Sequence, residues 1–73
     1  MVKMNLVEKE FRIMRMLDEY GMAVVKWVGP DYCVVIVIPT TESRPLDKNT
    51  VFELKRKIWL ELGVKAEIEV ARY

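Results

Sequence analysis

Residues 32–38 read Tyr-Cys-Val-Val-Ile-Val-Ile, an uninterrupted apolar run in a chain of 73 residues. β-branched and aromatic residues in a short run of this kind predict a β-strand. Alternate side chains of a strand point to opposite faces of the sheet, so this strand is apolar on both faces. Such a strand is typical of the middle of a sheet that is covered on both sides.

The length of the chain limits how that cover can be supplied. A chain of 73 residues has material for about one layer of helices. One face of the sheet therefore lacks cover from the chain itself. We expect a homo-oligomer, with a dimer as its simplest form, or one protein partner to cover it.

Hydrophobic periodicity, capping residues and turn residues predict the other elements. A wide apolar arc predicts a first helix, and a narrower central stripe predicts a second. Glycines mark the end of each helix. The predicted elements are a helix from Met4 or Asn5 to Tyr20 ending at Gly21, a strand 22–28, a turn 29–31, a helix from Asp47 or Thr50 to Leu62, and a strand 64–71.

These elements predict a single α+β domain over residues 1–73 with the order α-β-β-α-β. The short turn at Gly29-Pro30-Asp31 makes the first two strands antiparallel and pairs Val28 with Tyr32. The second helix is a right-handed crossover to a parallel third strand. The prediction is a three-stranded mixed sheet of order 1-2-3 with both helices on one face.

The hairpin has two candidate open faces. One carries Trp27, and an apolar patch with an aromatic residue is typical of a protein interface. The alternatives are that the face containing Lys26 is the open one, or that a tail folds over the patch. The predicted interface consists of Ala23, Val25, Trp27, Cys33, Val35 and Val37.

The composition of the chain argues against several classes of function. With 12 basic and 11 acidic residues the net charge is +1, unlike the basic excess of a typical nucleic-acid binder. The chain has no His and one Cys, so we expect no metal site, no cofactor and no catalysis.

No apolar run is long enough for a membrane span, and we expect a cytoplasmic protein. The absence of Gln beside many charged residues favours a thermophilic source.

The rival hypothesis is a small nucleic-acid or anion-binding protein that uses the 40–48 loop and the second helix. A loop between a strand end and a helix N-terminus often holds anions. Its candidate ligands are Thr40, Thr41, Ser43, Arg44 and Lys48. The loop lacks glycine, and Glu42 and Asp47 bring competing negative charge, so a plain connector is favoured.

Two further groups of charges have ordinary structural explanations. Glu10 and Asp18 fall inside the apolar arc of the first helix, where a carboxylate pair could transfer protons. An arc-edge position, or a salt bridge to Lys26 or Lys55, is favoured instead. The basic run 55–57 fans around the second helix, which favours a solvated surface over a nucleic-acid site.

The element order and the helix–Gly–strand ending Leu62-Gly63-Val64-Lys65-Ala66-Glu67 resemble one known family. This is the small cytoplasmic C-terminal domain of cation-diffusion transporters. The resemblance implies a dimeric domain that regulates metal export. The histidines of its metal-binding members are absent, and no site residue is transferred from it. The strand 32–38, apolar on both faces, predicts self-association or protein binding without catalysis as the function.

Overall fold

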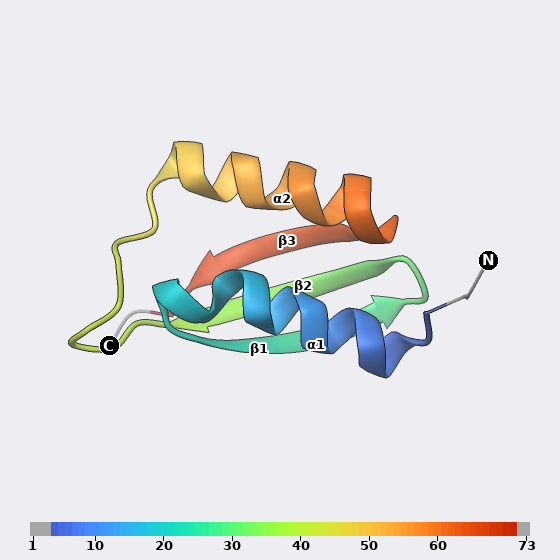
Figure 1. Cartoon of the computed structure of the whole chain (residues 1–73), viewed down its shortest axis with the longest axis horizontal. Coiled ribbons are helices and arrows are strands. Elements are labelled where there is room, and N and C mark those ends of the chain that lie inside the picture. Colours follow the sequence, from blue (N-terminus) through green and yellow to red (C-terminus); the bar gives the residue numbers. More distant parts are fainter. Residues whose placement is uncertain (1–3, 72–73) are drawn as a thin grey trace.

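The structure is a computed structural model that describes residues 4–71. The predicted α+β class and the predicted element order are confirmed (Figure 1). A short 3-10 helix, η1, is added to the predicted elements. The elements are α1 Leu6–Leu17, η1 Asp18–Tyr20, β1 Met22–Gly29, β2 Tyr32–Ile38, α2 Lys48–Leu62 and β3 Lys65–Val70.

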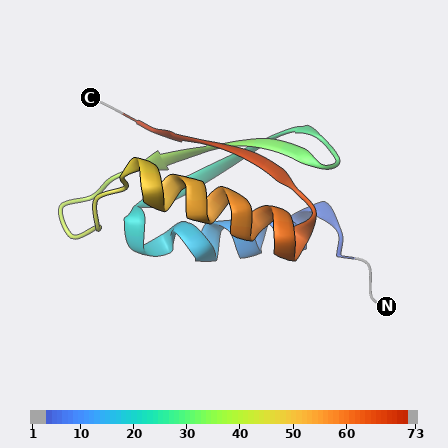
Figure 2. The same cartoon turned by 90° about the horizontal axis from the view of Figure 1, so that it is seen from above.

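The predicted sheet topology is also confirmed. The strand order is β1-β2-β3, with β1 antiparallel and β3 parallel to β2. Figure 2 shows α1 and α2 together on one side of the sheet. The chain thus forms two layers, one of helices and one of strands, as its length predicts.

Local side chains fix where the helices begin. The Asn5 side chain accepts a hydrogen bond from the Glu8 N–H at 2.9 Å at the start of α1. The Asp47 Oδ1 accepts one from the Thr50 N–H at 2.7 Å at the start of α2. Of the two predicted starts of the second helix, Asp47 is therefore the N-cap. Gly63 ends α2 in the left-handed region, with φ 65° and ψ 27°.

The end of the first helix differs from the prediction. The α-helical hydrogen bonding stops at Leu17, and Asp18–Tyr20 tighten into the 3-10 helix η1. Gly21 does stop the helix, but with φ 141° and ψ −168° it is not in the left-handed helical region. At Gly21 the chain passes from the helical layer to the sheet. A Cβ at this position would collide with the backbone carbonyl of Ile38, so only glycine can occupy it.

The hairpin turn is one residue shorter than predicted. Gly29 pairs with Tyr32, which leaves Pro30 and Asp31 as the turn and corrects the predicted Val28–Tyr32 pair. A bulge between Trp27 and Gly29 then restores the register, and Trp27 pairs with Cys33. The predicted division of the hairpin residues between two faces is therefore confirmed for Met22 to Trp27 and their partners on β2.

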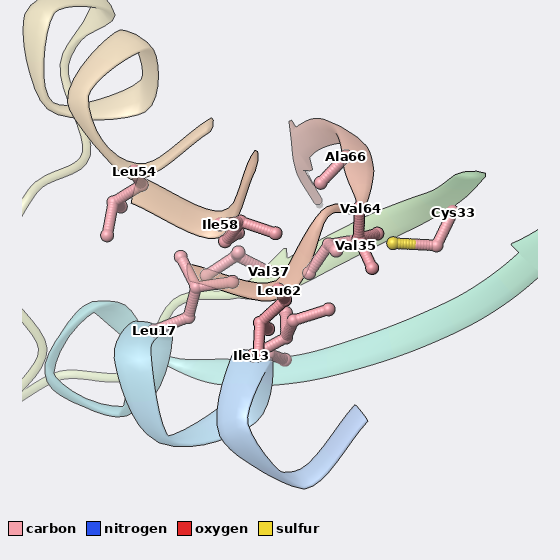
Figure 3. Close-up of a cluster of buried hydrophobic side chains, with 11 residues drawn as sticks. Ile13, Leu17, Cys33, Val35, Val37, Leu54, Ile58, Leu62, Val64 and Ala66 are labelled. Atoms are coloured by element: carbon pink, nitrogen blue, oxygen red, sulfur yellow. The ribbon is translucent and has the colours of Figure 1, made fainter. Parts of the chain in front are cut away.

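The core lies between the sheet and the two helices (Figure 3). α1 contributes Ile13 and Leu17, which are fully buried. The other core residues come from α2, from all three strands and from Val64, which lies just before β3. They are Ala23, Cys33, Val35, Val37, Leu54, Ile58, Leu62, Val64 and Ala66.

Candidate functional site

The six residues of the predicted interface lie on the covered face of the sheet. Cys33, Val35 and Val37 are completely buried and Ala23 is nearly so. Val25 and Trp27 are partly buried and pack against the same core. The predicted choice of face is therefore wrong, and the alternative, in which the Lys26 face is open, describes the fold.

The reason lies in the size and charge of the side chains. Small residues on the covered face, namely Ala23, Cys33 and Ala66, let the helices approach the sheet closely. The charged residues of the strands lie on the opposite face. Lys26 and Glu67 both pair with Val34, and paired residues lie on the same face of a sheet. Lining up the third strand with the hairpin would have revealed this pattern in the sequence.

The open face carries an apolar column along β2 between two partly charged edges. Tyr32, Val34, Ile36 and Ile38 form the column, and each is half-buried by its neighbours. The β1 edge adds three large apolar residues, Met22, Val24 and Val28, of which 63, 45 and 61% is exposed. The β3 edge adds Lys65, Glu67 and Glu69, which alternate with the inward residues of that strand.

The β1 edge of this face carries the positive charge of Lys26, whereas the β3 edge carries Glu67 and Glu69 together with Lys65. Lys26 stands in the middle of β1, and Glu67 stands in the same row on β3. Lys55 reaches from α2 to the Glu67 Oε2, with its Nζ 3.3 Å away. The two ion pairs found among residues 4–71 are this one and Arg44–Glu19, so Lys26 has no ionic partner within the described part of the chain.

Glu10 has a structural partner rather than a catalytic one. Its Oε1 accepts a hydrogen bond from the Trp27 indole N–H at 3.1 Å. This contact ties α1 to the edge strand β1 and accounts for a carboxylate in the apolar arc. The expected alternatives, a salt bridge to Lys26 or to Lys55, are not formed among the described residues.

Cys33 has the properties of a core residue. Burial raises the pKa of its thiol, and the negative charge of Glu10 raises that pKa further. The thiolate, which is the nucleophilic form, is therefore disfavoured. The arrangement suits packing and not nucleophilic chemistry.

The 40–48 loop is held by its own hydrogen bonds. The Ser43 Oγ accepts from the Thr40 N–H and donates to the Thr40 carbonyl oxygen, both at 2.9 Å. The Arg44 N–H donates to the Glu19 carbonyl oxygen at 2.8 Å, which anchors the loop to η1. At the N-terminus of α2, the position an anion would take is filled by the Asp47 carboxylate. Thr41 and Lys48 are exposed beside it.

The basic run of α2 divides between different surroundings. Lys55 pairs with Glu67, whereas Arg56 and Lys57 line a shallow groove that also contains Glu53 and Glu61. A second groove between the helices brings Lys57 and Glu61 beside Arg12 and Arg15. The outer surface of the helices thus mixes both signs of charge, as the solvated-surface interpretation predicts.

The helices also expose apolar side chains. Val7, Phe11 and Met14 form a stripe at helical spacing on α1, and Phe11 is 66% exposed. Phe52, Trp59 and Leu60 are exposed on α2. This second apolar surface is interrupted by charged residues, including Arg15 and Asp18 beside Phe11 and Met14.

Comparison with known proteins adds no relative. No family model matches the chain, no curated protein matches it, and no solved structure matches it. The likeness to the transporter domain therefore stays one of element order. Among residues 4–71 no helix has the length and apolar content needed to cross a membrane. The same residues contain no group of three or more His, Cys, Asp or Glu side chains placed to hold a metal ion.

Proposed function

We propose that this chain is a non-catalytic self-associating module whose open sheet face is buried against a second copy. The observation that carries the proposal is the apolar column of β2, flanked by exposed Met22, Val24 and Val28. Apolar patches that continue across several strands are typical of interfaces. A second copy is the simplest occupant, because it presents an equally apolar face of the same shape.

The expected interface is small. Three strands of about the length of β2, which has 7 residues, cover a projected area of about 330 Å² at a spacing of about 4.8 Å and a rise of about 3.3 Å per residue. The relief of the side chains raises the accessible surface of this face to about 500 Å² in each copy. Two copies would bury on the order of 1,000 Å², at the lower end of specific interfaces. We therefore expect a dimer that dissociates on dilution.

The absence of catalysis is part of the proposal. It is supported by the buried, protonated thiol of Cys33 and by the indole partner of Glu10. Composition supports a cytoplasmic protein from a thermophile. The anion-binding hypothesis has less support, because Ser43, Arg44 and Asp47 are engaged within the chain.

The test is a matched pair of substitutions, Val34→Asp on the open face and Phe11→Asp on the exposed stripe of α1. The Val34→Asp variant should remain folded but lose self-association, because a carboxylate at the centre of an apolar interface is costly to bury. The Phe11→Asp variant should associate like the unchanged chain. Sedimentation velocity measures both.

Two results would contradict the proposal. If Phe11→Asp dissociates the assembly and Val34→Asp does not, the helical surface is the interface. If the unchanged chain sediments as a monomer at every concentration, the open face serves a different protein partner or none.

A further inference from the structure

We infer that two copies pack open face to open face about a two-fold axis almost parallel to β2, so that Lys26 of each copy pairs with the partner's Glu67. This inference rests on the proposed self-association and adds to it an orientation and a set of ionic contacts. It follows from the distribution of charge on the open face. Lys26 and Glu67 both belong to the described part of the chain.

The first step is the position of the charges. Lys26 pairs across the sheet with Val34, and Val34 pairs with Glu67. Lys26 and Glu67 therefore occupy one row, on opposite edges and about 10 Å apart at ordinary strand spacing. Val34 lies at the midpoint of this row.

The second step is the symmetry of the packing. A two-fold axis along the middle strand exchanges the two edges, so β1 of one copy lies over β3 of the other. Lys26 then faces the partner's Glu67, and by symmetry Glu67 faces the partner's Lys26. A lysine and a glutamate side chain together span the ~10 Å between packed sheets.

The other simple packing gives Lys26 no ionic partner. An axis perpendicular to the strands places β1 over β1 and β3 over β3 of the two copies, with the strand directions reversed. β1 contains no carboxylate, so Lys26 would face a second lysine or an apolar residue, while Glu67 or Glu69 could face the partner's Lys65. A charge left without an opposite charge at an interface disfavours association, so Lys26 favours the axis along β2.

The selected packing also agrees with the apolar pattern. β2 lies over the partner's β2, which buries the apolar column at the centre and leaves the ion pairs at the rim. Sheets packed in this way cross at about −30°, which needs only a small tilt of the axis from the strand direction. The Lys55 Nζ is paired with the Oε2 of Glu67. The other carboxylate oxygen of Glu67 is left to accept a hydrogen bond from Lys26 of the other copy.

Charge reversal tests the inference. Lys26→Glu and Glu67→Lys should each raise the Kd of self-association about tenfold or more, because symmetry turns two attractive pairs into two repulsive ones. The double variant restores both pairs with reversed sign and should recover most of the affinity. An equimolar mixture of the two single variants should form a heterodimer for the same reason.

Three controls separate this effect from net charge and from folding. Arg56→Glu on the exposed surface of α2 changes net charge as Lys26→Glu does, and Glu61→Lys changes it as Glu67→Lys does. Lys55→Gln breaks the ion pair with Glu67 and replaces no residue of the open face. All three should associate within about threefold of the unchanged chain. Sedimentation equilibrium measures each Kd, and far-UV circular dichroism confirms that each variant is folded.

The outcomes distinguish this inference from the proposed function. If Val34→Asp dissociates the dimer while the single reversals do not, the face is correct and the orientation is wrong. If the double variant associates no better than the single ones, the direct pairing of Lys26 with the partner's Glu67 is overturned. A monomeric unchanged chain would remove both proposals together.

Discussion

The two faces of the sheet are both apolar along β2, but they lie in different environments. On β2, Val35 is completely buried beneath the helices, whereas its neighbour Val34 lies half-exposed on the other side. The covered face has the small residues Ala23 and Cys33, and the open face has the large Met22 and the charged Lys26. Hydrophobicity alone does not separate the faces, because residue size and the few charges decide which one the helices cover.

The largest effect should come from placing the same charge on each face of β2. Val35→Asp buries a carboxylate among Ile13, Leu17 and Ile58, and should cost about 4 kcal/mol or more, enough to unfold a domain of this size. Val34→Asp should leave the far-UV circular dichroism of the monomer unchanged. Equal loss of structure in both variants would contradict the division into a covered and an open face.

A smaller contrast is expected when isoleucine is shortened to alanine. Ile58 is completely buried between α2 and the sheet, so Ile58→Ala should lower the free energy of unfolding by about 2–5 kcal/mol. Ile36→Ala on the open face should cost the monomer about 1 kcal/mol or less, because no helix packs against it. Urea denaturation at concentrations below the dimer Kd measures both. A larger loss at Ile36 would mean that the chain itself covers the open face.

The sequence predicted most of the fold because its signals are local. The apolar run 32–38 correctly placed β2, and the helix stop at Gly63 correctly placed the end of α2. The sequence left Asp47 and Thr50 as alternative starts of that helix, and Asp47 is the N-cap. Two local details were wrong: the hairpin has a two-residue turn with a bulge, and α1 tightens into η1. Both depend on contacts that a local pattern does not contain.

The open face was wrongly assigned for a non-local reason. Trp27 resembled an interface residue, but its indole N–H donates to Glu10 and its ring packs against the core. The decisive signal is the cross-strand row of Lys26, Val34 and Glu67, which becomes visible only when β3 is aligned with the hairpin. The rival anion-site hypothesis likewise could not take account of the hydrogen bonds of Ser43 and Asp47.

The smallest effect is expected away from both faces, at the N-cap of α2. The hydrogen bond from the Thr50 N–H holds the pKa of Asp47 below its ordinary value. A carboxyl group whose pKa falls on folding stabilises the folded chain above its unfolded pKa, and this stabilisation is lost as the pH falls through the folded pKa. Asp47→Ala should therefore lower the Tm slightly at neutral pH and have less effect in acid.

Asp47→Asn is the matched control for that variant. Asparagine is also a good N-cap, so it should retain the Tm at neutral pH and lose the acid-dependent part of the difference. Thermal melts of the three chains between neutral and acidic pH measure the contrast. A difference between Asp47→Ala and the unchanged chain that does not vary with pH would contradict the assigned role of the carboxylate.

The most direct test of the central claim is the solution mass of the unchanged chain. Light scattering after size exclusion, across roughly a hundredfold range of concentration, measures it without any substitution. Burial of the open face against a second copy predicts a mass that rises from one chain of 8.6 kDa toward twice that value. A mass of one chain at every concentration would contradict self-association.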